Sequence, residues 1–245
     1  FVVITDIFSR LLPQHFRADT HPGAYIGRIS PRRIGQKKDF WNRLSLAYQD
    51  LLIQETLGKF KQRGRVPVRQ VIEKFFTEFH EMDANVMTAD PLGFPGFRSS
   101  IEKALNSGIP PCGAVTGLAR FSGPDLDCRV GVLVSNLEFQ AGAFDMAAAE
   151  KLCRLLTHCA QRRFPVIGFV SSGGMQTKEG AGGLFPMAVV NALITRFVRE
   201  HDLPVIMFGF GDCTGGAQAS FVTHPLVHTW YFSGTNMPFA GQIVV

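Results

Sequence analysis

Residues 164–221 contain one pattern twice, and this repeat limits the possible folds of the chain more than any other feature. Each copy has a short apolar run introduced by a proline, then a polar bend and a Gly-Gly pair; the runs are Val166–Val170 and Val205–Phe210. Continuous apolar runs rich in β-branched and aromatic residues are typical of strands buried on both faces. Between the runs, Glu179–His201 carries apolar residues at helical spacing. The sequence therefore predicts a β-α-β unit.

The two pairs, Gly173-Gly174 and Gly215-Gly216, follow the two predicted strands. Glycine lets the backbone come close to a ligand, and a helix that begins after such a turn leaves its first N–H groups without intrahelical partners. Two sets of free donors at neighbouring strand ends can hold one developing negative charge. We therefore predict a backbone oxyanion hole at Gly173, Gly174, Gly215 and Gly216. The alternative is that both pairs are tight turns without a function.

The segments around both pairs resemble the carboxyltransferase β subunit of acetyl-CoA carboxylase, a member of the crotonase-like superfamily. The family pattern SGGAR-x-x-E-(G/A) corresponds to Ser172–Gly180, TGG-x-x-ASF to Thr214–Phe221, and the FAG of IGFAG to Phe239–Gly241. The resemblance covers roughly residues 64–245. It implies an α/β fold of the crotonase type, a spiral of β-β-α units, here with an N-terminal helical extension.

The chain departs from the family pattern at several positions. Met175 and Gln176 replace the alanine and arginine of SGGAR, and Gln242 replaces the arginine after FAG. The family loop FMGGSMG is Phe139–Asp145 here and keeps one of its three glycines. Losing two positive charges near an anionic coenzyme A (CoA) thioester weakens binding or alters the substrate. The resemblance implies cofactor contacts from Gln140, Ala141, Gly142, Met175, Gln176, Ala240 and Gly241.

The resemblance also implies the reaction. The chain would be the carboxyltransferase component of a biotin-dependent acyl-CoA carboxylase, with acetyl-CoA the expected substrate and malonyl-CoA the product, as in fatty acid biosynthesis. Carboxybiotin would release CO₂, the biotin anion would take an α proton from the acyl-CoA, and the enolate would attack CO₂. Partners would be an α-type carboxyltransferase subunit, a biotin carboxyl carrier protein and biotin carboxylase, with activity only in the complex. A decarboxylase subunit of the same fold and a catalytically divergent scaffold subunit remain alternatives.

Composition supports a chain with a substantial core, because 46% of the residues are hydrophobic and 18% are charged. No apolar run reaches the roughly eighteen residues that span a bilayer, so we expect no membrane span. The five cysteines lack CxxC spacing, and none before Cys112 supplies the zinc ribbon with which the bacterial β subunit usually begins. We therefore expect no zinc, and a reducing compartment: the cytoplasm, or an organelle matrix or stroma in a eukaryote.

We divide the chain into a basic N-terminal extension with a helix, residues 1–63, and a carboxyltransferase domain, residues 64–245, whose C-terminal part we expect to be missing. Up to Lys38 the extension has seven basic residues against two acidic ones, which is typical of a solvated arm; a nucleic-acid partner is not expected. Further predicted elements are helices at Asp39–Phe60, Gly64–Met82, Arg98–Leu105 and Ala143–Arg162, a loop at Asp90–Gly96, and a hairpin of Val115–Phe121 with Val130–Val134.

Other side chains with chemical potential are better explained by packing. Ser171, Ser172 and Cys213 lie at strand ends, where nucleophiles occur, but the sequence places no partner base beside them. His224 and His228 are four residues apart, yet Pro225 between them argues against one helix and a metal site.

One predicted helix is unusually apolar. Leu184, Phe185, Met187 and Val190 lie close together in it, which indicates either an interface with another polypeptide or burial in the domain's own core.

Overall fold

The centre of the fold is one six-stranded sheet with the strand order β1-β2-β3-β4-β5-β6. The computed structural model describes residues 66–123, 126–232 and 235–238, so the extension 1–63 and its predicted helix lie outside the described residues. Neighbouring strands are antiparallel from β1 to β3 and parallel from β3 to β6. The strands are β1 (Thr77–Met82), β2 (Ala114–Gly123), β3 (Leu126–Ser135), β4 (Val166–Ser172), β5 (Val205–Cys213) and β6 (His228–Tyr231).

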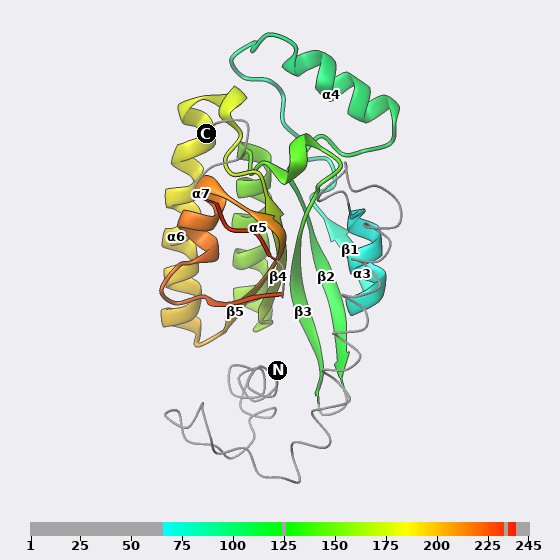
Figure 1. Cartoon of the computed structure of the whole chain (residues 1–245). Coiled ribbons are helices and arrows are strands. Elements are labelled where there is room, and N and C mark those ends of the chain that lie inside the picture. Colours follow the sequence, from blue (N-terminus) through cyan, green and yellow to red (C-terminus); the bar gives the residue numbers. More distant parts are fainter. Residues whose placement is uncertain (1–65, 124–125, 233–234, 239–245) are drawn as a thin grey trace.

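Helices cover both faces of the sheet (Figure 1). The long helices α5 (Met146–Arg162) and α6 (Ala181–His201) pack against each other on one face, and α3 (Val68–Phe75) packs on the other. Helix α4 (Phe97–Asn106) lies beyond the carboxyl ends of the parallel strands (Figure 1). Short helical turns follow the strands: η2 (Gln140–Gly142), η3 (Thr177–Glu179), α7 (Gly215–Ala217) and the π-helix η4 (Gln218–Val222).

Side chains of the central strands alternate between two hydrophobic cores. In β4, Val166 and Val170 belong to the core with α5 and α6, whereas Ile167 and Phe169 belong to the core with α3. All seven residues of β4 are buried, as its continuous apolar run predicts. Burial on both faces holds β4 and β5 in place, and it therefore positions the Gly-Gly pairs that follow them.

Most predicted elements of the domain are confirmed. β4, α6 and β5 form a β-α-β unit with parallel strands, and β2 pairs with β3 as a hairpin from Ala114 opposite Ser135 to Gly123 opposite Leu126. The loop before α4 and α4 itself also lie where the sequence predicts them.

The predicted helix Gly64–Met82 is wrong in its second half. The helix ends at Phe75, Phe76 is extended and 5% exposed, and β1 begins at Thr77. β1 pairs antiparallel with β2 and carries an irregularity between Thr77 and His80. Pairing with β2 satisfies the backbone hydrogen bonds of this segment, and such long-range pairing overrides local helical periodicity.

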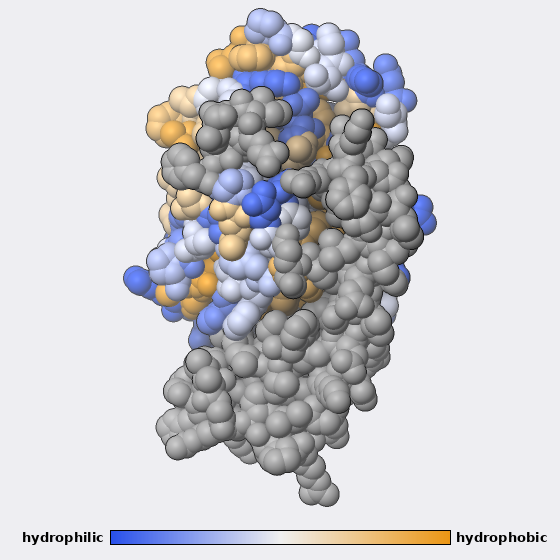
Figure 2. Space-filling view, viewed as in Figure 1, coloured by the Kyte–Doolittle hydropathy of each residue, from blue (hydrophilic) through white to orange (hydrophobic). Residues whose placement is uncertain are grey.

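Helix α6 divides into buried and exposed apolar residues. Met187 and Val190 are 3% and 0% exposed and belong to the core, so of the two alternatives burial in the domain's own core holds for these two. Leu184 and Phe185 are 51% and 69% exposed, and hydrophobic surface lies near the start of α6 (Figure 2). By length and composition alone α6 could cross a membrane, contrary to our expectation, although core packing explains the apolar character of its buried face.

Candidate active site

The two Gly-Gly pairs meet at the carboxyl ends of β4 and β5. Ser172 of β4 pairs with Cys213 of β5, and the Thr214 N–H donates to the Ser172 carbonyl over 3.0 Å. A Cβ atom added to Gly174 would lie 3.5 Å from the Gly215 Cα and 3.6 Å from the Gly216 nitrogen. The predicted convergence of the two pairs is therefore present in the fold.

Conformation explains why glycines stand at this junction. Gly174 has a φ of 106° and Gly215 a φ of 56°, which L side chains rarely adopt. Gly216 has an ordinary φ, but an added Cβ would lie 3.0 Å from the Met187 Cε atom and 3.3 Å from the Met175 Cβ atom. Backbone atoms of both strands thus approach each other with no side chain between them.

The N–H groups of the first pair are already used within the protein. Gly173 donates to the Ala141 carbonyl over 3.0 Å, and Gly174 donates to the Ser172 Oγ atom over 3.1 Å. The expectation of two sets of free donors is therefore not met at the first pair. Among the described residues, the N–H groups of Gly215 and Gly216 have no acceptor, and α7 has no side-chain cap.

Met175, which follows the first pair, supplies a further donor. It forms an isolated parallel bridge with Phe144, in which Phe144 donates to the Gly174 carbonyl and Gln176 donates to the Phe144 carbonyl. The bridge leaves the Met175 N–H without an acceptor among residues that the structure describes. Donors at Met175, Gly215 and Gly216 therefore flank the junction.

The loop Gln140–Gly142 supports the first pair directly. Its three residues all have positive φ, 47°, 53° and 66°, an unusual run for a segment in which only one residue is glycine. The Gly142 carbonyl accepts from the Ser172 Oγ atom over 2.7 Å, and the Ala141 carbonyl accepts from Gly173. The structure thus brings Gln140, Ala141 and Gly142 beside the Gly-Gly segment.

Of the remaining predicted cofactor contacts, the structure describes Gln176 but not Ala240 and Gly241. Gln176 is 3% exposed; its Oε1 atom accepts from the Lys178 N–H over 3.4 Å, and its Nε2 atom has no partner among residues 66–123, 126–232 and 235–238. Ala240 and Gly241, together with Gln242, lie outside the described residues.

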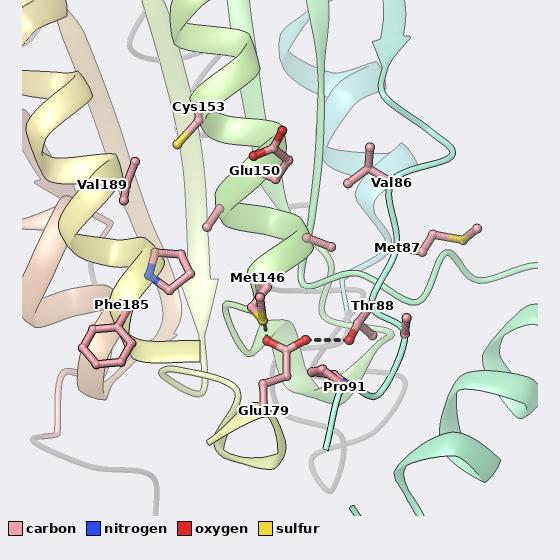
Figure 3. A pocket seen from close by; sticks show the side chains of 14 residues that line it. Val86, Met87, Thr88, Pro91, Met146, Glu150, Cys153, Glu179, Phe185 and Val189 are labelled. Carbon is pink, nitrogen blue, oxygen red and sulfur yellow. Dashed lines mark hydrogen bonds between the residues drawn. The ribbon is translucent and has the colours of Figure 1, made fainter. Parts of the chain in front are cut away.

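A buried carboxylate, Glu179, ties the Gly-Gly segment to its surroundings (Figure 3). It is 1% exposed, and its two oxygens accept from the Thr88 hydroxyl over 2.5 Å and from the Met146 N–H over 2.7 Å. Glu179 also lines a largely apolar cavity of about 570 Å³ between the segment 86–91, α5 and α6. With both oxygens engaged, this carboxylate holds the loop and the start of α5 in place.

Asp145 is a second buried carboxylate, and the sequence analysis missed its role. It is 1% exposed and caps α5: its oxygens accept from the Ala148 N–H over 2.6 Å and from the Gly113 N–H over 2.8 Å. Burial raises its pKa to about 6, and the negative charge of Glu179 contributes to that raised pKa. An aspartate directly before an apolar helical run is the signal that would have identified this cap.

The candidate nucleophiles have structural roles, as predicted. The Ser171 hydroxyl donates to the Asp212 carbonyl over 3.1 Å. The Ser172 hydroxyl donates to the Gly142 carbonyl and accepts from the Gly174 N–H. Cys213 is 1% exposed, and burial raises its pKa to about 12, so its thiol stays protonated at neutral pH. Among described residues, no group of three or more His, Cys, Asp and Glu side chains could hold a metal ion.

Comparisons with known proteins identify the class of the fold. No protein-family model matches the chain. The fold resembles the transcarboxylase 12S core with methylmalonyl-CoA bound, with a TM-score of 0.60 and 17% identity over 89% of this chain and 39% of that one. It also resembles the Pseudomonas malonate decarboxylase heterodimer, with a TM-score of 0.50 and 16% identity over 76% and 72% of the two chains. The fold is therefore that of the crotonase-like carboxyltransferases and decarboxylases.

The sequence comparison is more specific. Over 182 residues the chain is 30% identical to the acetyl-CoA carboxylase carboxyl transferase subunit beta of Ligilactobacillus salivarius (strain UCC118), a match that covers 71% of this chain and 62% of the relative. The chain is therefore similar in sequence to the carboxyltransferase β subunit of acetyl-CoA carboxylase. It spans less than two thirds of that relative's length.

Proposed function

We propose that this chain is the carboxyltransferase subunit of a biotin-dependent acyl-CoA carboxylase, with acetyl-CoA as the expected substrate. The observation that carries the proposal is the junction of the two Gly-Gly segments, where the N–H groups of Met175, Gly215 and Gly216 have no acceptor among the described residues. Carboxybiotin, delivered on its carrier protein, supplies the carboxyl group. The chain's own contribution is to hold the negative charge that develops on the thioester oxygen.

Backbone donors suit this task. An enolate places negative charge on the thioester oxygen, and N–H groups fixed in position stabilise that charge without reorganising. Removing one such donor typically lowers turnover by about 100- to 1000-fold. We propose the N–H groups of Gly215, Gly216 and Met175 as the donors, in place of the four glycines, because Gly173 and Gly174 already donate to Ala141 and Ser172.

No acid–base side chain of this chain is assigned to the α proton. The buried carboxylates Asp145 and Glu179 have both oxygens engaged by N–H or O–H donors, and Cys213 is a protonated thiol. We therefore propose that the base is the biotin ureido group, as the family resemblance implies. In this proposal the CoA ester lies along Gln140–Gly142, Met175 and Gln176, and Ala240 and Gly241 complete its site.

The exposed apolar side chains support an enzyme that acts in a complex. Leu184, Phe185 and Val189 at the start of α6 are 51%, 69% and 55% exposed. Exposed apolar clusters usually mark contacts with other proteins. Biotin and acyl-CoA are both large and reach one point from different directions. We propose that an α-type carboxyltransferase subunit completes the site, and that the biotin carrier and biotin carboxylase join the same assembly.

A decarboxylase subunit is the second candidate, because a malonate decarboxylase shares the fold and the reverse reaction passes through the same kind of enolate. The assembly in which the chain occurs should be purified and supplied with labelled bicarbonate, ATP and acetyl-CoA. We expect ATP-dependent label in an acid-stable product, and inhibition by avidin. Release of CO₂ from malonyl thioesters without ATP would favour the decarboxylase. Binding of partners without any turnover would favour a scaffold.

A further inference from the structure

One lysine beside the Gly-Gly segment, Lys178, has no acidic partner among the residues that the structure describes. Lys178 lies in η3 and is half-buried. Its Nζ atom donates to the Gln140 Oε1 atom over 2.8 Å and lies 5.1 Å from the centre of the Phe97 ring. Within the described residues no carboxylate lies within ion-pair distance of this ammonium group. An amide oxygen and an aromatic face orient a cation but do not neutralise its charge.

Both partners of Lys178 belong to segments that border the candidate active site. Gln140 begins the loop whose next residue, Ala141, accepts the Gly173 N–H. Phe97 begins α4, which lies beyond the carboxyl ends of the parallel strands (Figure 1). In open α/β sheets, ligands bind at the carboxyl ends of the strands. The ammonium group is thus held at the edge where the proposed substrate would enter.

Two further features mark this corner as built for a ligand. Gln140 and Ala141 both have positive φ, and consecutive strained residues persist only where their surroundings enforce them, typically at functional sites. Gln176, two residues before Lys178, is 3% exposed, and its Nε2 atom has no hydrogen-bond partner in the described part of the chain. A buried donor without an acceptor is costly unless a ligand or water satisfies it. The segment from Gln176 to Lys178 therefore contains a buried amide donor without an acceptor among the described residues and an ammonium group that is held only by neutral partners.

We infer that Lys178 is a specificity-determining residue that binds an anionic group of the thioester substrate. This inference rests on the proposed function. The anion is either a phosphate of the CoA part or a carboxylate carried by the acyl group; both are recognised by a compact cation such as a lysine ammonium. Gln140 and Phe97 position the ammonium group.

The test measures dissociation constants in the assembly that contains the full chain, for the wild type, Lys178→Gln, Lys178→Arg and the control Lys103→Gln. Lys103 is exposed in the last turn of α4. The ligands are acetyl-CoA, malonyl-CoA and S-acetyl-pantetheine, which lacks phosphates. We expect Lys178→Gln to weaken binding of at least one CoA ester about tenfold and to flatten its salt dependence. Lys178→Arg should bind within about threefold of the wild type, and Lys103→Gln should not differ from it.

The ligand series separates the two anions. Equal losses for acetyl-CoA and malonyl-CoA, with unchanged binding of S-acetyl-pantetheine, assign Lys178 to a phosphate. A loss confined to malonyl-CoA assigns it to the acyl carboxylate. Unchanged binding of both CoA esters by Lys178→Gln would overturn the inference, and so would an equal loss for S-acetyl-pantetheine. If the wild type binds no thioester at all, the proposed function itself fails.

Discussion

Replacing Gly174 by alanine tests the backbone-donor site with a single methyl group. The residue has a φ of 106°, and the added Cβ would lie 3.5 Å from the Thr214 carbonyl oxygen and 3.6 Å from the Gly216 nitrogen. The methyl group would therefore occupy the space beside one of the proposed donors. It would not clash severely, since none of these contacts is shorter than ordinary van der Waals distance.

Two effects should follow, and they differ in size. Forcing an L residue to this sparsely populated φ costs about 1–3 kcal/mol of folding stability. Displacing an oxyanion from one donor costs about 2.7–4 kcal/mol in the barrier, which lowers turnover about 100- to 1000-fold. The loss of turnover should thus exceed anything that the loss of stability explains, because a destabilised protein that remains folded keeps its turnover.

Gly108 provides the matched control. It has a φ of 69°, and an added Cβ would meet no atom within 4 Å. Gly108→Ala should therefore show a similar loss of stability without a change in turnover. Urea unfolding measures the first quantity, and steady-state carboxylation by the assembled enzyme measures the second. If Gly174→Ala is folded and turns over within about threefold of the wild type, the donor site is not where we place it.

Further predictions concern single groups. Ser172→Ala leaves the Gly142 carbonyl and the Gly174 N–H without their partner, so the free energy of unfolding should fall by about 1–3 kcal/mol; an unchanged urea midpoint would contradict this. Lys151 is 0% exposed, and its Nζ atom has no hydrogen-bond partner among the described residues. Lys151→Met should therefore raise the free energy of unfolding by about 1–3 kcal/mol, and a lower midpoint would refute the reasoning. Burial raises the pKa of Asp145 to about 6, so between about pH 4 and pH 6 the folded state retains a proton that the unfolded state releases. The contribution of Asp145 to stability should therefore be lost as the pH rises from about 4 through 6. Carboxyl NMR should show titration near 6 and not near about 4. Elemental analysis should find no stoichiometric zinc, because a structural zinc site needs about four ligands held together; one zinc per chain would oppose that expectation.

The elements that the sequence predicts well are those with local causes. The runs Val166–Val170 and Val205–Phe210 have too many apolar residues for a surface strand, and the turn after residue 121 joins two segments of clear period-two alternation. The sequence of β1 is also compatible with a helix, because Phe75, Phe79 and Met82 stand at helical spacing. Only its pairing with β2 decides the outcome.

The candidate site, like the fold, is predictable from the sequence only in part. Glycines after two buried strands reveal where backbone donors gather, since the fold brings the ends of β4 and β5 together. Whether those donors are free depends on residues far apart in the chain. Gly173 meets the Ala141 carbonyl only because the loop Gln140–Gly142 returns to β4, and Lys178 meets Gln140 across 38 residues. No periodicity or spacing contains that information.

The central claim is that this chain holds a thioester enolate at the Gly-Gly junction and needs a second polypeptide for the transfer. The most direct measurement compares carboxyl transfer from carboxybiotin to acetyl-CoA by the chain alone and by the assembly purified with its partners, with the mass of each species determined in parallel. We predict acetyl-CoA-dependent transfer by the assembly and none by the isolated chain. Full turnover by a monomer of 27.0 kDa, or no transfer by an assembly that contains biotin carrier and biotin carboxylase, would contradict the account.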